Sequence, residues 1–225
     1  FFLSVNYPDP HRPFISQAGG LPKKPLNASD VKPLAYFGID SSELREQTAN
    51  YYNCMSRLDS LIGDLLSTLR KSGKFENTLI VYFGDHGADM LRGKRTSYEG
   101  GVRVPLIIKW ADRWKSVRQE LVSTLDLLPT LLEAAGAEAV PNLPGRSLLP
   151  LLDGRSQEWR SHLFTEFHIH SAHNYYPQRT VRNDRFKLIQ NLLPNEVNPG
   201  CDFTINRFFD GLGEVITSAP EPVSS

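Results

Sequence analysis

An adjacent acid and imidazole, Asp85 and His86, stand just after an apolar run and are followed by a lysine, Lys94, in a glycine-rich segment. The apolar run, residues 79–83, is typical of a buried strand. In open α/β sheets, ligands bind beyond the carboxyl ends of the strands, where loops converge. A carboxylate and an imidazole at such a place can hold a cation, and a nearby ammonium group can bind an anion. This combination suits chemistry on a sulfate or phosphate group.

Each of these residue types also has an ordinary structural use. Asp85 and His86 could simply cap a strand-to-loop turn. Most lysines in proteins are solvated surface residues, and Lys94 could be one of them. Taken alone, Asp85 and His86 favour this ordinary use, although a second glycine-rich segment, residues 98–101 (YEGG), follows Lys94 closely. The two donor types do not determine the identity of the metal, because carboxylate oxygen suits calcium whereas imidazole suits zinc better.

A second group of polar residues lies in the C-terminal third and contains Glu166, His168, His170 and His173. His168 and His170 alternate with apolar residues, so both are predicted to project from one face of a strand. That spacing could form a metal site, yet no matching pair of ligands stands out in the sequence. A solvated strand face is the ordinary alternative.

The order of predicted elements is that of an α/β protein. Apolar runs predict strands at residues 1–5, 79–83 and 105–110. The run 79–83 is apolar throughout, as in a parallel core strand. Apolar residues at intervals of three or four predict a long helix, which Asp40 and Glu43 cap and which ends near residue 72, before Gly73. A second helix is predicted over residues 126–136. Residues 163–169 and 180–190, the latter turning at 183–184, predict a small antiparallel sheet.

Composition excludes several classes of protein. The 225 residues carry 25 basic and 25 acidic side chains, a balance that argues against nucleic-acid binding. No apolar run approaches the ~20 residues that a membrane-spanning helix needs. Two cysteines, Cys54 and Cys201, are too few for a disulfide framework, and Cys54 is predicted to be a small buried side chain of the long helix.

Several motifs together identify a family. Residues 84–87 (GDHG), 93–94 (GK) and 98–101 (YEGG) resemble the second half of a sulfatase, in the alkaline-phosphatase superfamily. Residues 2–5 leading into 9–13 (DPHRP) resemble the family's mid-domain strand and catalytic histidine. Residues 125–132 and 145–150 are also sulfatase-like, and residues 173–182 (HNYYPQRTVR) are similar to the heparan N-sulfatase (sulfamidase) branch. Lys94 departs from that branch, which has arginine at this position.

The resemblance implies a fold and a set of roles. The fold is α/β, an alkaline-phosphatase-like mixed, mostly parallel sheet flanked by helices, with a small C-terminal antiparallel sheet. Asp85 and His86 would bind one divalent cation, calcium in this family. Lys94 would neutralise a sulfate oxygen and His11 would protonate the leaving group. The remaining implied contacts, with a sulfated carbohydrate such as a glycosaminoglycan glucosamine, are those of Glu166, His168 and Arg179, although Arg179 could equally be a structural salt-bridge partner.

The resemblance also implies parts that this chain does not contain. Sulfatases carry a Cys-x-Pro-Ser-Arg motif, whose cysteine becomes the formylglycine nucleophile, and an Asp-Asp pair that binds calcium; neither occurs here. Residues 54–57 (CMSR) lack the proline and place serine and arginine one position early. We therefore expect a fragment that is inactive alone, from a periplasmic, secreted or lysosomal protein. Residues 1–155 would be the second half of the catalytic domain, and residues 156–225 a small α+β subdomain with a disordered tail.

Two alternatives remain open. One is a phosphodiesterase or phosphonate hydrolase of the same superfamily, which the Asp-His-Gly motif also permits. The other is a non-catalytic relative that binds sulfated sugars and has lost the nucleophile. The identity of the nucleophile in the parent protein distinguishes them. The oligomeric state is not predicted.

Overall fold

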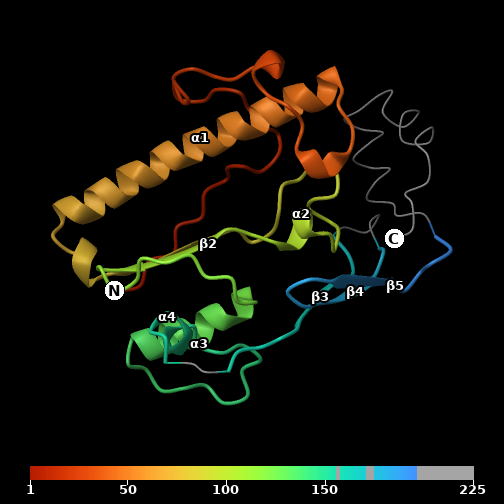
Figure 1. Cartoon of the computed structure of the whole chain (residues 1–225). Coiled ribbons are helices and arrows are strands. Elements are labelled where there is room, and N and C mark those ends of the chain that lie inside the picture. The colour runs from red at the N-terminus through yellow and green to blue at the C-terminus, as the bar shows by residue number, and fades with distance from the viewer. Residues whose placement is uncertain (156–157, 171–174, 197–225) are drawn as a thin grey trace.

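A computed structural model describes residues 1–155, 158–170 and 175–196. Its first sheet is an antiparallel ribbon of two strands, β1 (Leu79–Phe83) and β2 (Leu106–Trp110), in which Leu79 lies opposite Trp110. Figure 1 shows the long helix α1 on one side of this ribbon and the short helices α3 and α4 on the other. The arrangement is therefore layered, with helices covering both faces of the ribbon.

The helix α1 (Ser42–Lys71) follows the apolar periodicity of its sequence. Ser41 is the N-cap, and its side-chain oxygen accepts a hydrogen bond from the backbone N–H of Leu44. Asp40 does not cap the helix as predicted, because its carboxylate pairs instead with Arg45 at 2.6 Å. Gly73 ends the element with φ of 71°, which a residue without Cβ adopts freely. Both predicted ends are thus confirmed to within a residue or two.

Helices α3 (Leu127–Ala134) and α4 (Leu149–Leu152) pack on the ribbon through an apolar cluster. Leu127, Leu148 and Leu151 are buried there, against Val81 of β1 and neighbouring strand residues. Burying such side chains stabilises the fold by about 1.5–3 kcal/mol each. The remaining short helices are η1 (Ala28–Asp30), η2 (Ala35–Phe37), η3 (Phe75–Asn77), α2 (Glu99–Val102) and η4 (Thr124–Asp126).

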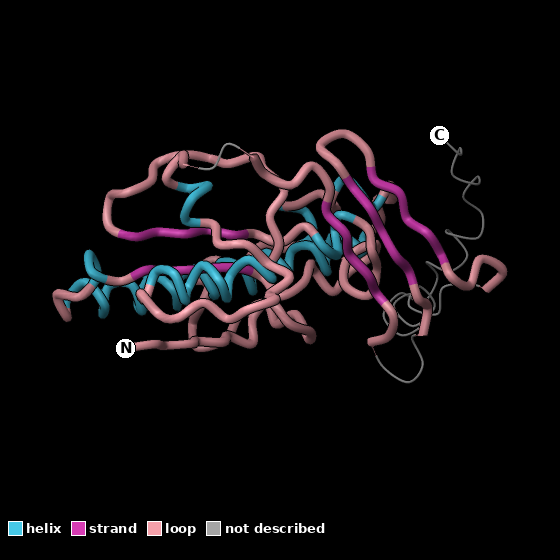
Figure 2. Tube along the Cα trace, turned by 90° about the horizontal axis from the view of Figure 1, so that it is seen from below, coloured by secondary structure: helices cyan, strands magenta, loops and turns pink. Residues whose placement is uncertain are grey.

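A three-stranded antiparallel sheet follows in the C-terminal part and confirms that prediction. Its strands are β3 (Leu163–Phe167), β4 (Gln178–Arg182) and β5 (Lys187–Asn191), paired in the order β3-β4-β5. The turn between β4 and β5 is closed by Asn183, whose side-chain oxygen accepts from the backbone N–H groups of Arg185 and Phe186. Figure 2 shows the three strands side by side at one end of the molecule.

Two expectations about strands differ from the structure. Residues 1–5 form no strand, and Phe1 and Phe2 are 84% and 81% exposed, because a strand needs a hydrogen-bonded neighbour and none lies beside them among the described residues. β1 was predicted to have a parallel neighbour, but its partner in the described part of the chain, β2, is antiparallel. The apolar run therefore predicted a strand, whose residues are partly buried, without indicating the direction of its neighbour.

Some predictions fall on residues that the structure does not describe. Cys201, His173 and the tail at residues 218–225 lie outside the described residues. The proposed division near residue 155 stays a prediction. Across the described ranges, no helix combines the length and the apolar character required to cross a membrane.

Candidate active site

His11 and Lys94, 83 residues apart in sequence, meet in the structure. The Nζ atom of Lys94 lies 3.3 Å from Nε2 of His11. His11 is exposed and Lys94 is half-buried, so both side chains can reach a ligand from solvent. The two residues predicted to do the chemistry are therefore brought together.

The hydrogen bonds of His11 define which nitrogen carries its proton. Its Nδ1 lies 2.7 Å from the carbonyl oxygen of Arg12, which can only accept a hydrogen bond. Nδ1 is therefore the donor, and Nε2 of the neutral ring offers its lone pair to the Lys94 ammonium group. The loop itself is closed by a bond from the His11 backbone N–H to the carbonyl of Pro8 at 2.7 Å.

Asp85 and His86 lie in the loop that leaves the carboxyl end of β1. His86 Nδ1 donates to the carbonyl of Gly87 at 2.7 Å, so its Nε2 lone pair is directed elsewhere, and Nε2 lies 3.6 Å from Oδ2 of Asp85. A carboxylate oxygen and an imidazole nitrogen at this separation can bind one cation together. The Asp85 side chain is 84% exposed, which leaves it free to reach such an ion.

These two donors are not a complete metal site by themselves. Over the ranges that the structure describes, no group of three or more His, Cys, Asp or Glu side chains is placed to hold a metal ion. A calcium ion takes about six to eight oxygen ligands. Asp85 and His86 could therefore supply a minority of the ligands of such an ion.

Glycines allow the two parts of the loop to touch. The backbone N–H of Gly87 donates to the carbonyl of Gly101 at 2.8 Å. A Cβ on Gly87 would lie 1.7 Å from the carbonyl oxygen of Gly100, and a Cβ on Gly93 would lie 2.0 Å from that of Ala88. Only residues without side chains fit at these crossings, so the glycines hold the segment of Asp85 against the segment of Lys94.

A buried carboxylate, Asp89, ties the loops of both catalytic candidates together. It is 5% exposed, and its Oδ2 accepts a hydrogen bond from Nη2 of Arg95 at 3.0 Å. Its backbone carbonyl accepts from Nε of Arg12 at 2.7 Å. Arg12 follows His11 and Arg95 follows Lys94, so one residue anchors the neighbours of both. Arg95 therefore pairs with a buried carboxylate instead of facing solvent.

His170 was not among the residues predicted for the site, and its electrostatic surroundings include residues of the Lys94 loop. Partial desolvation and the positive charges of Lys94 and Arg95 lower the pKa of His170 below its ordinary value, while Asp89 acts in the opposite direction. Such effects require that these groups lie near one another. β3 ends at Phe167, so the prediction that His168 and His170 share one strand face is wrong. In the sequence, the one indication of His170 was its position in a histidine-rich segment.

The three predicted substrate contacts form a separate cluster on the small sheet. Glu166 Oε2 lies 3.4 Å from Nε2 of His168 and 4.0 Å from Nε of Arg179, its cross-strand neighbour. All three side chains are 46–63% exposed, and their ion pairs join Glu166 of β3 to Arg179 of β4 and to His168, which follows β3 directly. The structure brings them together with one another but does not join them to His11 and Lys94.

The small sheet is attached to the glycine-rich loop. Glu99 accepts hydrogen bonds from Nη1 of Arg182 at 2.6 Å and from Nζ of Lys187 at 2.9 Å. The buried Gln178 accepts from the backbone N–H of Ser97 at 3.1 Å. Figure 1 shows α2, which contains Glu99, between the ribbon and the small sheet. The sheet that carries the predicted substrate contacts is therefore held against the loop that carries Lys94.

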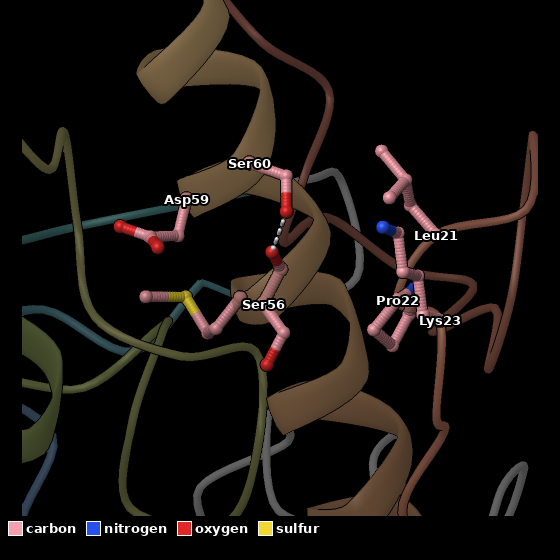
Figure 3. Close-up of a pocket in the computed structure, with 7 residues that line it drawn as sticks. Leu21, Pro22, Lys23, Ser56, Asp59 and Ser60 are labelled. Atoms are coloured by element: carbon pink, nitrogen blue, oxygen red, sulfur yellow. Dashed lines mark hydrogen bonds between the residues drawn. The ribbon is translucent and has the colours of Figure 1, made fainter.

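A pocket of about 580 Å³ lies elsewhere, between residues 21–23 and the helix α1. Figure 3 shows Lys23 on one side and Ser56, Asp59 and Ser60 of α1 on the other. None of the predicted site residues lines it. It is therefore separate from the candidate active site.

Comparison with known proteins places these features in context. The sulfatase family model matches residues 1–137, and the model for the C-terminal part of N-sulphoglucosamine sulphohydrolase matches residues 84–198. Human N-sulphoglucosamine sulphohydrolase is 29% identical over 222 residues, which cover 85% of this chain and 44% of the relative. The multifunctional alkaline phosphatase superfamily protein PehA of Trinickia caryophylli is 27% identical, over 81% of this chain and 43% of that protein.

Solved structures agree with the sequence comparison. A structure in complex with its substrate, D-glucosamine-2-N,6-O-disulfate, matches 70% of this chain and 34% of its own with a TM-score of 0.57 and 29% identity. A 2-O GAG sulfatase, at 23% identity, matches 79% of this chain and 41% of its own with a TM-score of 0.62, which supports the fold alone. The chain spans less than half the length of these relatives.

Proposed function

The chain belongs to the sulfatase family of the alkaline-phosphatase superfamily, and from that premise we propose that the parent protein hydrolyses the sulfate group of a sulfated carbohydrate. The observation that carries the proposal is the 3.3 Å approach of Lys94 Nζ to His11 Nε2. An ammonium group and an imidazole at this distance can act on one sulfate group, the first on its oxygens and the second on its leaving atom.

The hydrogen bonds of His11 support its proposed role as the general acid. Because Nδ1–H is engaged by the Arg12 carbonyl, a second proton can only enter the ring at Nε2. Nε2 faces the Lys94 ammonium group. When a sulfate group binds, Lys94 would turn to its oxygens, and protonated Nε2 would donate to the oxygen or nitrogen that leaves. Lys94 would thus stabilise the charge that develops as the bond to sulfur breaks.

We propose that Asp85 and His86, on the glycine-rich segment that also carries Lys94, bind one divalent cation. Calcium follows from the family resemblance, and the exposed Asp85 carboxylate suits it. The imidazole of His86 fits a softer ion better, so metal analysis of the parent protein decides between calcium and zinc. When bound there, the cation would supply charge neutralisation for the sulfate oxygens. A formylglycine derived from a cysteine outside this chain supplies the nucleophile.

The proposed substrate is a sulfated glucosamine of a glycosaminoglycan, with an N- or O-linked sulfate. The human relative is an N-sulphoglucosamine sulphohydrolase, and the substrate in a similar solved structure is a disulfated glucosamine. Glu166, His168 and Arg179 would contact the sugar, since the sheet that carries them is attached to the Lys94 loop through Glu99. By the same resemblance, we propose a periplasmic, secreted or lysosomal location.

A phosphoester hydrolase is the second candidate, since a multifunctional member of the alkaline phosphatase superfamily is similar over most of the chain. Kinetics of the parent protein test both. We expect hydrolysis of N-sulfoglucosamine or 4-nitrophenyl sulfate to exceed that of bis(4-nitrophenyl) phosphate. We further expect Lys94→Ala to lower kcat by roughly 10²–10³-fold with little change in the unfolding midpoint, because it removes charge stabilisation in the transition state.

The exposed Lys24→Ala is the matched control and should retain full activity. Preferential hydrolysis of the phosphodiester would establish the second candidate instead. Unchanged kinetics in Lys94→Ala would refute its role in catalysis. Binding of the sulfated sugar without turnover would indicate a non-catalytic relative.

A further inference from the structure

Arg57 is a buried cation in the middle of α1, a helix whose other buried residues carry no charge. Its side chain is 8% exposed and that of its partner, Asp9, is 13% exposed. Nε and Nη2 of Arg57 donate to the two carboxylate oxygens of Asp9 at 2.6 and 2.7 Å. A planar guanidinium matches a carboxylate in this two-bond geometry, and lysine cannot reproduce it.

The same guanidinium also reaches the other side of the loop. Nη1 of Arg57 donates to the carbonyl of Ile15 at 3.0 Å. The Sγ atom of Cys54, one helical turn earlier, lies 3.6 Å from the same carbonyl and 3.3 Å from Nη2 of Arg57. Asp9 precedes His11 by two residues and Ile15 follows it by four. Arg57 therefore holds both ends of the segment that presents His11.

Stability alone does not explain a charge at this position. Burying an ion pair costs desolvation energy that its attraction often only offsets, and apolar replacements are frequently as stable. A bidentate pair does, however, specify the position and orientation of its partners. The contacts on the other side of His11, from Arg12 to the carbonyl of Asp89 and to the side chain of Gln47, complete the anchoring of this segment.

We propose that Arg57 is a positioning residue for His11, acting through Asp9 and the Ile15 carbonyl to hold the imidazole where it can protonate the leaving group. The inference rests on the proposed function, because it presumes that His11 is the general acid. Arg57 itself does not touch the substrate. Its effect should therefore depend on how much protonation the leaving group requires.

The test compares leaving groups in the parent protein. A 4-nitrophenolate leaves without assistance, whereas a sugar alkoxide or amine needs the proton. We measure kcat/KM of Arg57→Lys for 4-nitrophenyl sulfate and for a sulfated glucosamine, and take the ratio of the two. The ratio is independent of the fraction of correctly folded enzyme, so a loss of stability cannot mimic the effect.

We expect Arg57→Lys to lower kcat/KM for the sugar sulfate by roughly 10²-fold, the effect of displacing a catalytic group such as His11 by about 1 Å. The kcat/KM for the aryl sulfate should fall much less. Arg45→Lys is the matched control, because Arg45 makes the same two-bond contact with Asp40 on the same helix but is 37% exposed. It should leave the ratio unchanged. Asp9→Asn, which removes the same contact from the other partner, should reproduce the change if Arg57→Lys fails to fold.

His11→Ala separates the inference from the proposed function. If His11→Ala changes the ratio but Arg57→Lys and Asp9→Asn do not, the positioning role of Arg57 is refuted and the role of His11 stands. If His11→Ala leaves the ratio unchanged, His11 is not the general acid, and the positioning role is refuted with it. Equal losses for both substrates in Arg57→Lys would indicate a purely structural residue.

Discussion

Replacement of Gly87 by alanine tests whether the glycine crossing holds the candidate active site. Gly87 follows Asp85 and His86 directly, and its N–H bonds to Gly101 of α2. A Cβ at this position would lie 1.7 Å from the carbonyl oxygen of Gly100 and 2.7 Å from its carbon. Both obstacles are backbone atoms, which cannot rotate away as the end of a long side chain can.

The magnitude follows from this overlap. The 1.7 Å approach is about 1.3 Å short of 3.0 Å, a limit that real Cβ atoms essentially never cross, so one backbone segment must shift by that amount. A shift of about 1 Å in a catalytic group can cost roughly 10²-fold in rate. We therefore expect Gly87→Ala to lower kcat/KM of the parent protein at least to that extent, for aryl and sugar sulfates alike, and to reduce its metal content.

Gly63→Ala is the matched control, because it makes the same chemical change on an exposed face of α1. A Cβ there would have no neighbour within 4 Å. Alanine is favoured over glycine inside a helix by roughly 0.5–1 kcal/mol, so this variant should be equally or more stable. Steady-state kinetics, elemental analysis and thermal unfolding compare the two. A Gly87→Ala protein with normal activity and metal content would refute the close crossing of these backbone segments.

Two further predictions concern buried and titrating groups. Asp126 is fully buried and accepts two 2.6 Å hydrogen bonds from Arg160, so Asp126→Asn should lower the free energy of unfolding by about 3–5 kcal/mol in urea titrations. Asp40→Asn is the control, and it should have little effect because its pair with Arg45 is exposed. A small change at Asp126 would contradict a buried ion pair. His170 should titrate below 6.5 in NMR spectra, and Lys94→Met should raise its pKa because a positive charge is removed. An unchanged pKa of His170 in Lys94→Met would show that the two residues lie apart. Because the pKa of His170 is lowered in the folded protein, its contribution to stability is complete above pH 6.5 and declines as the pH falls through its folded-state pKa.

The local elements could be predicted from the sequence alone. The extent of α1 follows from apolar periodicity and from Gly73, and both strands of the ribbon follow from apolar runs. The site candidates were visible as motifs, because glycine, aspartate, histidine and lysine stand together in residues 84–101. Such signals are readable because they depend on residues within a few positions of one another.

Strand direction and pairing were not readable in the same way. Residues 1–5 have the composition of a strand but form none, and β1 pairs antiparallel although its sequence resembles that of a parallel strand. Burial on two faces makes a strand apolar whichever way its neighbour runs. A strand also requires a partner, which its own residues do not specify.

The contacts that hold the site together depend on the packing of distant segments and could not be predicted from the sequence. The tertiary structure brought Lys94 to His11 across 83 residues and Arg57 to Asp9 across 48, and it directed Arg95 to Asp89. An ion pair between distant segments depends on where the packed elements place each side chain to within a few ångströms. Local periodicity carries no information about distances of a few ångströms between distant segments. The motif residues would have the same sequence if the loops lay apart.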